Sequence, residues 1–61
     1  MPWNEMYYPR SMRNLPLEVR LTAIEIANAL LEEGDEEGKA IRIAIAKAKE
    51  WAESVDERGE E

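Results

Sequence analysis

The chain lacks cysteine and histidine altogether, which excludes two common supports of small folds. Without cysteine there are no disulfides, and without either residue the usual structural zinc sites cannot form. A chain of 61 residues buries only about 60% of the surface of its unfolded state, so a monomer has little stability in reserve. Close packing of secondary structure, or self-association, must therefore hold the fold.

The sequence also lacks a long hydrophobic run. The longest apolar-rich segment, Ala23 to Leu31, is interrupted by Glu25 and Asn28. The N-terminus has no basic region followed by an apolar one. We therefore expect a cytoplasmic protein without a membrane partner, although the lack of cysteine decides little about the compartment.

The net charge is −6, and it is unevenly distributed. Residues 1–20 contain three arginines against two acidic residues, whereas residues 32–61 contain eleven acidic residues against five basic ones. Because counterion release by basic side chains supplies most of the affinity for nucleic acids, this chain is a poor general nucleic-acid binder unless the three arginines converge. The same charge balance argues against docking on anionic membranes.

The spacing of apolar residues predicts a first helix over residues 15–33. Asn14 or Leu15 is the expected cap, Pro16 suits the first turn and Gly34 is a natural stop. The apolar residues cover an arc of roughly 220°, whereas an ordinary surface helix needs a stripe of about 100°. This arc contains Leu17, Val19, Leu21, Ala23, Ile24, Ile26, Ala27, Leu30 and Leu31. Something besides a second helix must therefore cover it.

A second helix is predicted over residues 35–55, with Asp35 as its cap. The short connection around Gly34 favours an antiparallel hairpin with close approach of small residues. The core face contains Ala40, Ile41, Ala44, Ile45, Ala48, Trp51, Ala52 and Val55. Ile43 projects opposite this face, where it would meet the N-terminal segment or another molecule. Residues 56–61 have no apolar anchor, so we expect this acidic tail to fray.

The first twelve residues, MPWNEMYYPRSM, hold three of the four aromatic residues and all three methionines. Pro2 and Pro9 restrict their neighbours to extended conformations, and Ser11 can cap one short helical turn. We interpret residues 1–14 as a strap that covers the second flank of the first helix with Trp3, Tyr7, Tyr8 and Met12. The predicted fold is all-α: one domain over residues 1–55, an antiparallel two-helix hairpin with this aromatic and proline-containing strap packed on it.

Two polar residues, Arg20 and Asn28, fall within or beside the apolar arc of the first helix. Buried polar groups need partners. We expect Arg20 to stretch over the core toward a carboxylate and Asn28 to bond the backbone of the strap. The alternative for Arg20 is a small anion-binding patch shared with Arg10 and Arg13.

No pattern in the sequence indicates catalysis. Ser11 and Ser54 form no constellation with an acid or a base, and they fit a turn cap and an exposed helix position instead. The acidic run over residues 32–38 has the wrong spacing for a calcium loop and is typical of a solvated helix boundary. We therefore expect no enzymatic activity, no cofactor, no metal and no small-molecule substrate.

The segments MPW, YPRSMRNLPLEVR, AIEIANALLEEG and GKAIRIAIAKAKEWAE together resemble the YdaT-like family of small uncharacterised bacterial proteins. This resemblance covers nearly the whole chain and implies a short α-helical module without an established activity. A more distant similarity to ChaB-family proteins rests on the Pro-x-Ser segment, the Leu-Pro helix start and the step Asn28-Ala29-Leu30. ChaB proteins are labelled cation-transport regulators, but their domain is longer between the helical segments. Arg10 also stands where an acidic residue is expected in such relatives.

These observations leave two main classes of function. The first is a non-enzymatic helical protein-interaction module that binds an unknown protein or another copy of itself. Because Trp, Tyr and Arg are typical of binding hot spots, the candidate partner-binding residues are Trp3, Tyr7, Tyr8, Arg10, Arg13, Arg20 and Ile43. The second is weak nucleic-acid association through the basic N-terminal third. A third, in which the acidic face mimics a nucleic acid, rests on charge alone.

Overall fold

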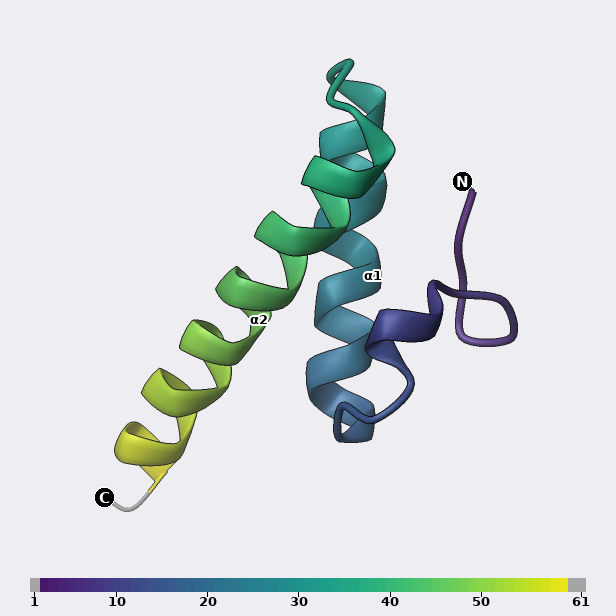
Figure 1. Cartoon of the computed structure of the whole chain (residues 1–61). Helices are drawn as coiled ribbons and strands as arrows, with labels where there is room; N and C mark the ends of the chain where they lie inside the picture. The colour runs from purple at the N-terminus through teal and green to yellow at the C-terminus, as the bar shows by residue number, and fades with distance from the viewer. Residues whose placement is uncertain (1, 60–61) are drawn as a thin grey trace.

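The computed structural model describes the backbone of residues 2–59 and the side chains of residues 2–54. A short 3-10 helix, η1, spans Arg10–Met12; α1 spans Leu17–Glu32 and α2 spans Glu37–Gly59. Figure 1 shows α1 and α2 as an antiparallel hairpin, with the strap beside α1. The described residues form no strand, so the predicted all-α hairpin with a strap and one helical turn is confirmed.

The first helix begins later than the sequence predicts. Pro16 is the N-cap, and its carbonyl accepts the first helical hydrogen bond, from the Arg20 N–H at 2.8 Å. The residue before a proline is driven away from helical conformations, so Leu15 cannot join the helix. No side chain caps α1, and the expected cap Asn14 stays exposed.

The connection between the helices is a glycine-terminated turn. Gly34 has a φ of +101° and donates its N–H to the Leu31 carbonyl at 3.0 Å. The Asp35 N–H donates to the Leu30 carbonyl at 3.1 Å. This pair of bonds is the Schellman motif, which satisfies carbonyls at the end of α1 and reverses the chain.

The second helix also begins two residues later than expected. The Asp35 N–H still bonds to the Leu30 carbonyl of α1, and the first bond at the start of α2 runs from the Ala40 N–H to the Glu36 carbonyl at 2.8 Å. At the other end α2 continues to Gly59, through most of the segment expected to fray. Residues 56–58 include no helix breaker, and each added helical residue brings a further backbone bond. Residues 60–61 lie outside the described residues.

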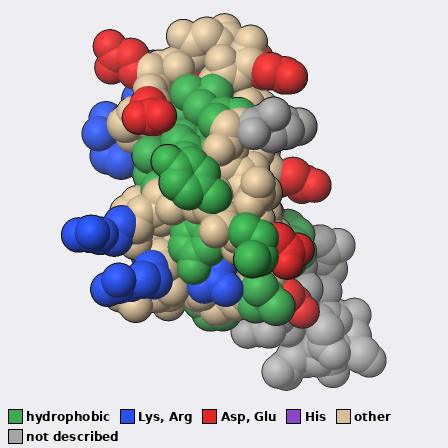
Figure 2. Space-filling model, turned by 90° about the vertical axis from the view of Figure 1, so that its right-hand side faces the viewer, with side chains coloured by type: hydrophobic (Ala, Val, Ile, Leu, Met, Phe, Trp, Pro, Cys, Tyr) green, Lys and Arg blue, Asp and Glu red, His purple; other side chains and the backbone are tan. Residues whose placement is uncertain are grey.

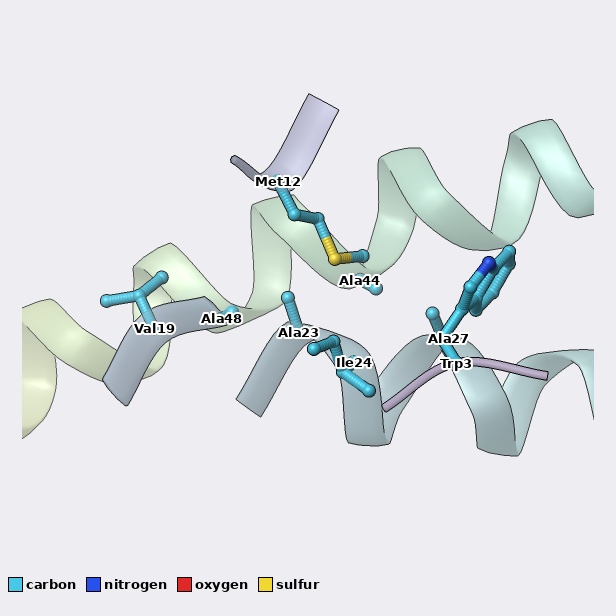
Figure 3. Close-up of a cluster of buried hydrophobic side chains, with 8 residues drawn as sticks. All are labelled: Trp3, Met12, Val19, Ala23, Ile24, Ala27, Ala44 and Ala48. Carbon is cyan, nitrogen blue, oxygen red and sulfur yellow. The ribbon is translucent and has the colours of Figure 1, made fainter. Parts of the chain in front are cut away.

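Alanines form the contact between the two helices. Ala23 and Ala27 of α1 are fully buried, as is the α2 row that contains Ala40, Ala44 and Ala48. Such small residues let helix backbones approach closely but supply little apolar bulk. The strap supplies it: in Figure 3 the Met12 side chain reaches toward Ala23 and Ala44, and Trp3 lies beside Ala27. Strap and helices therefore share one hydrophobic core.

Three large side chains assigned to the core by periodicity are exposed instead. Leu17 is 57% exposed, and Leu21 and Trp51 are also on the surface. The predicted arc assumes that the whole apolar face of a helix is covered. Leu17 and Leu21 lie on a flank of α1 that the strap leaves uncovered. Trp51 lies beside the row of α2 residues that faces the core, Ala44, Ala48 and Ala52. Figure 1 also shows that the helices lie together near their connection and spread apart toward their other ends.

Candidate interaction surface around the strap

A tight turn over residues 4–7 forms the outer part of the strap. The Asn4 side-chain oxygen Oδ1 accepts hydrogen bonds from the N–H groups of Met6 at 2.8 Å and Tyr7 at 2.9 Å. The backbones of Asn4 and Tyr7 also bond to each other in both directions, at 2.8 and 3.1 Å. This side-chain-to-backbone bonding is typical of asparagine at turns. It fixes Met6 at the tip, where it is 89% exposed.

The strap is anchored to α1 by Asn28. This buried amide donates Nδ2 to the Trp3 carbonyl at 2.9 Å and accepts from the Trp3 N–H at 3.2 Å. Both backbone groups of Trp3 are thereby satisfied away from water. The expectation that Asn28 bonds the strap backbone is confirmed, and two hydrogen bonds carry it.

The three aromatic rings of the strap have different environments. Trp3 is 6% exposed and belongs to the core, whereas Tyr7 is 69% exposed. Tyr8 is half-buried and packs against the core cluster. The turn at Asn4 reverses the chain between Trp3 and Tyr7, so one ring points inward and the other outward. Tyr7 is therefore the ring available to a partner.

Arg20 does not have the environment that the sequence suggests. Its Nη1 donates to the Arg13 carbonyl at 3.3 Å, and its guanidinium carbon lies 5.0 Å from the centre of the Tyr8 ring. The expected carboxylate partner is replaced by a backbone carbonyl and an aromatic face, because the strap crosses α1 at this position. The Nε atom is buried without a hydrogen-bond partner among the described residues.

The three arginines of the N-terminal third lie in one neighbourhood. Arg10 and Arg13 sit at the start and the end of the η1 turn, where the Arg13 N–H donates to the Arg10 carbonyl at 3.0 Å. Arg20 joins them through the Arg13 carbonyl. The side chains of Arg10 and Arg13 are exposed. Pro9 precedes η1 without a side-chain cap, and Ser11 lies inside the turn that it was expected to cap.

Ile43 is not brought together with these residues. It is half-buried on α2 and lies outside the core cluster, whereas Ile41 and Ile45 pack against that cluster. At about 100° per residue, Ile43 occupies the opposite flank of α2 from Ile41 and Ile45. It therefore does not share a surface with Tyr7 or the arginines.

Sequence reasoning missed several exposed residues. Met6 was not singled out, although Asn4 two residues earlier is a recognisable turn signal. Leu17 and Leu21 were assigned to the core by their place in the apolar arc. Their exposure depends on where the strap ends, which no local pattern encodes.

The described residues offer neither a metal site nor a membrane span. No group of three potential ligand side chains comes together within them. Neither described helix combines the length and the hydropathy needed to cross a bilayer.

The sequence is similar to a known bacterial protein. Over 55 residues, or 90% of this chain, it is 59% identical to the "Uncharacterized protein YdaT" of Bacillus subtilis (strain 168). By sequence, the chain resembles YdaT-like proteins over most of its length. It spans 37% of the length of that relative, and the relative's name assigns no activity.

No family model matches the chain, so the more distant resemblance to ChaB proteins stays a prediction. No solved structure matches it either. The arrangement of strap and hairpin is therefore described from this chain alone.

Proposed function

We propose that this chain is a non-enzymatic helical protein-interaction module and that the turn over residues 4–7 is its main contact point. The observation that supports this proposal is the exposure of Met6 and Tyr7 on a turn that is held on both sides. Asn4 fixes the turn internally, and the Asn28 bonds to Trp3 fix its base.

A turn held in this way is suited to binding because little conformational freedom remains to be lost. Ordering a flexible loop on binding costs part of the interaction free energy, and a preorganised loop avoids that cost. Tyrosine and methionine are also enriched at protein interfaces, while tyrosine has only two side-chain torsions to fix. Tyr7 and Met6 therefore combine apolar area with a low entropic cost.

The distribution of apolar volume supports the same proposal. Single exposed apolar residues are common on proteins and mean little by themselves. Here, however, alanines make up much of the buried core, while five large apolar side chains lie on the surface: Met6, Tyr7, Leu17, Leu21 and Trp51. A chain with so little core has an unusual share of its large apolar side chains available to a partner.

A matched set of variants tests the proposal by cross-linking capture from host cells. The wild type and the control Glu5→Ser should recover the same proteins, whereas Met6→Ser/Tyr7→Ser should lose them. Glu5 is an exposed residue of the same turn, so this control keeps the backbone and changes no apolar contact. Recovery of the same proteins by the double variant would contradict the proposal. Cell fractionation tests the cytoplasmic location that we also propose.

Weak association with nucleic acid is a second candidate, because Arg10, Arg13 and Arg20 lie together. Phosphate contacts by such a group would give binding whose affinity falls steeply with salt. Arg10→Gln/Arg13→Gln should weaken that binding and reduce the salt dependence by about two phosphate contacts. The absence of a mobility shift at low salt would remove this candidate.

A further inference from the structure

One face of the molecule separates its charges around an apolar band. Figure 2 views the side on which the strap lies in Figure 1: hydrophobic side chains run down the middle, and Lys and Arg gather along the left edge. Asp and Glu side chains lie along the right edge and near the top. A partner for this face must therefore match both signs of charge.

The register of α1 places three exposed glutamates in one column. Glu18, Glu25 and Glu32 recur at intervals of seven and are all exposed, so they form one column along the helix. Leu17 and Leu21 lie beside this column and are exposed as well. At about 100° per residue, Leu21 is only roughly 40° from Glu25 around the helix.

Arginines lie on the other side of these leucines around α1. Around α1 the order is Arg20, then Leu17 and Leu21, then the glutamate column. The bond from Arg20 to the Arg13 carbonyl places the η1 turn, with exposed Arg13, on the arginine side of the leucines. Arg20 and Glu18 also lie at nearly the same level along the helix, because two residues rise by about 3 Å.

We propose that a second copy of this chain packs against this face about a two-fold axis parallel to α1. Such a rotation brings the apolar bands together and exchanges the two edges. The arginines of each copy then face the glutamates of the other, at the same level along the helix. A two-fold axis across α1 would instead place like charges together, which costs binding free energy.

The two signs of charge favour a second copy over other occupants. A nucleic acid would match the arginine edge but meet the glutamate column of α1. The net charge of −6 does oppose association of two copies at long range. At physiological ionic strength this repulsion is screened beyond about 8 Å, whereas the paired edges lie in direct contact. This inference rests on the proposed interaction function and adds a second copy of the chain as the partner of the face beside α1.

Charge reversal at either edge tests the proposal by sedimentation at micromolar concentration. Wild type should form dimers. Glu18→Lys/Glu25→Lys makes both edges basic, and Arg10→Glu/Arg13→Glu makes both acidic, so each should weaken dimerisation by about tenfold or more. An equimolar mixture of the two variants should form heterodimers, because their edges are again opposite in charge.

Heterodimers in the mixture would also show that both variants are folded, because only folded chains can pair. The loss of each homodimer could then not be due to unfolding. The control Lys39→Glu/Lys47→Glu reverses two exposed charges on the flank of α2 that contains Ile43, and should dimerise like the wild type at matched salt. A monomeric wild type, or a mixture without heterodimers, would overturn the proposal. If other proteins were still captured through Met6 and Tyr7 by a monomeric chain, the interaction function would stand and this choice of partner would fail.

Discussion

Asn28, near the middle of α1, holds the backbone of Trp3 through two hydrogen bonds across 25 positions of sequence. The Asn28 side chain thereby makes the two backbone hydrogen bonds that a neighbouring strand would make with Trp3. The Trp3 ring can then enter the core while the chain continues outward to the exposed turn at Met6. The anchor of the fold and the proposed contact point are thus four residues or fewer apart.

Replacing Asn28 should destabilise the fold strongly. Asn28→Ala leaves the buried N–H and carbonyl of Trp3 without partners, and each unsatisfied group costs about 1–3 kcal/mol. Urea unfolding should show a midpoint well below that of the wild type. Asn14→Ala is the control, because Asn14 is exposed and does not cap α1. Equal midpoints for Asn28→Ala and the wild type would show that the two bonds contribute nothing.

The two methionines of the strap should respond in opposite ways to truncation. Met12 is fully buried, so Met12→Ala opens a cavity and should lower the free energy of unfolding by about 2–5 kcal/mol. Met6 is exposed at the turn, and Met6→Ala should change the free energy of unfolding by no more than about 0.5 kcal/mol. Similar effects of the two substitutions in chemical denaturation would contradict the packing of Met12 between the helices.

Alanine substitution at the two glycines near the connection should change the stability in opposite directions. Gly34→Ala should cost about 1–2 kcal/mol, because its φ of +101° is strained for any residue with a Cβ although nothing blocks the space. Gly38→Ala should instead stabilise by about 0.5–1 kcal/mol, since Gly38 lies within α2 and its new Cβ would meet only the Arg42 side chain at 3.8 Å. Thermal melting distinguishes them: a higher Tm for Gly34→Ala would contradict the turn geometry.

Removing the strap should remove two large buried side chains from the core. Deletion of residues 1–12 takes away Trp3 and Met12 together, and loss of one large buried side chain alone costs about 3–5 kcal/mol. A domain of this size has about that much stability in total. Circular dichroism should therefore show no cooperative thermal transition. A truncated chain that melts cooperatively at the wild-type temperature would show that the hairpin folds without the strap.

Much of this fold follows from local patterns. The helical periodicity and Gly34 predict the hairpin, and the excess width of the apolar arc on α1 predicts that the strap must cover it. The same reasoning assigns Asn28 to the strap backbone, because a polar group at the edge of a buried face needs a partner. These predictions succeed because each depends on one element and its immediate neighbour.

Other features depend on how the elements meet in three dimensions. The periodicity of α2 places Trp51 in the core, but the α2 residues that face the core follow the row Ala44, Ala48 and Ala52, which leaves Trp51 partly exposed beside it. Charge alone predicts a carboxylate partner for Arg20. The path of the strap instead brings the Arg13 carbonyl within hydrogen-bonding distance of the Arg20 guanidinium. The ring exposed to a partner is likewise set by the reversal at Asn4. Angles between helices and the crossing point of a loop are not properties of a local sequence.

Amide hydrogen exchange at Trp3 tests the central claim, that the strap is part of the folded core, most directly. Because the Trp3 N–H donates to buried Asn28, we expect its exchange to be as slow as that of amides in the middle of α1. The N–H of Glu5, at the exposed turn, makes no hydrogen bond to the described residues and should therefore exchange fast. Fast exchange at Trp3 beside slow exchange in α1 would contradict the claim, since the strap would then open independently of the hairpin.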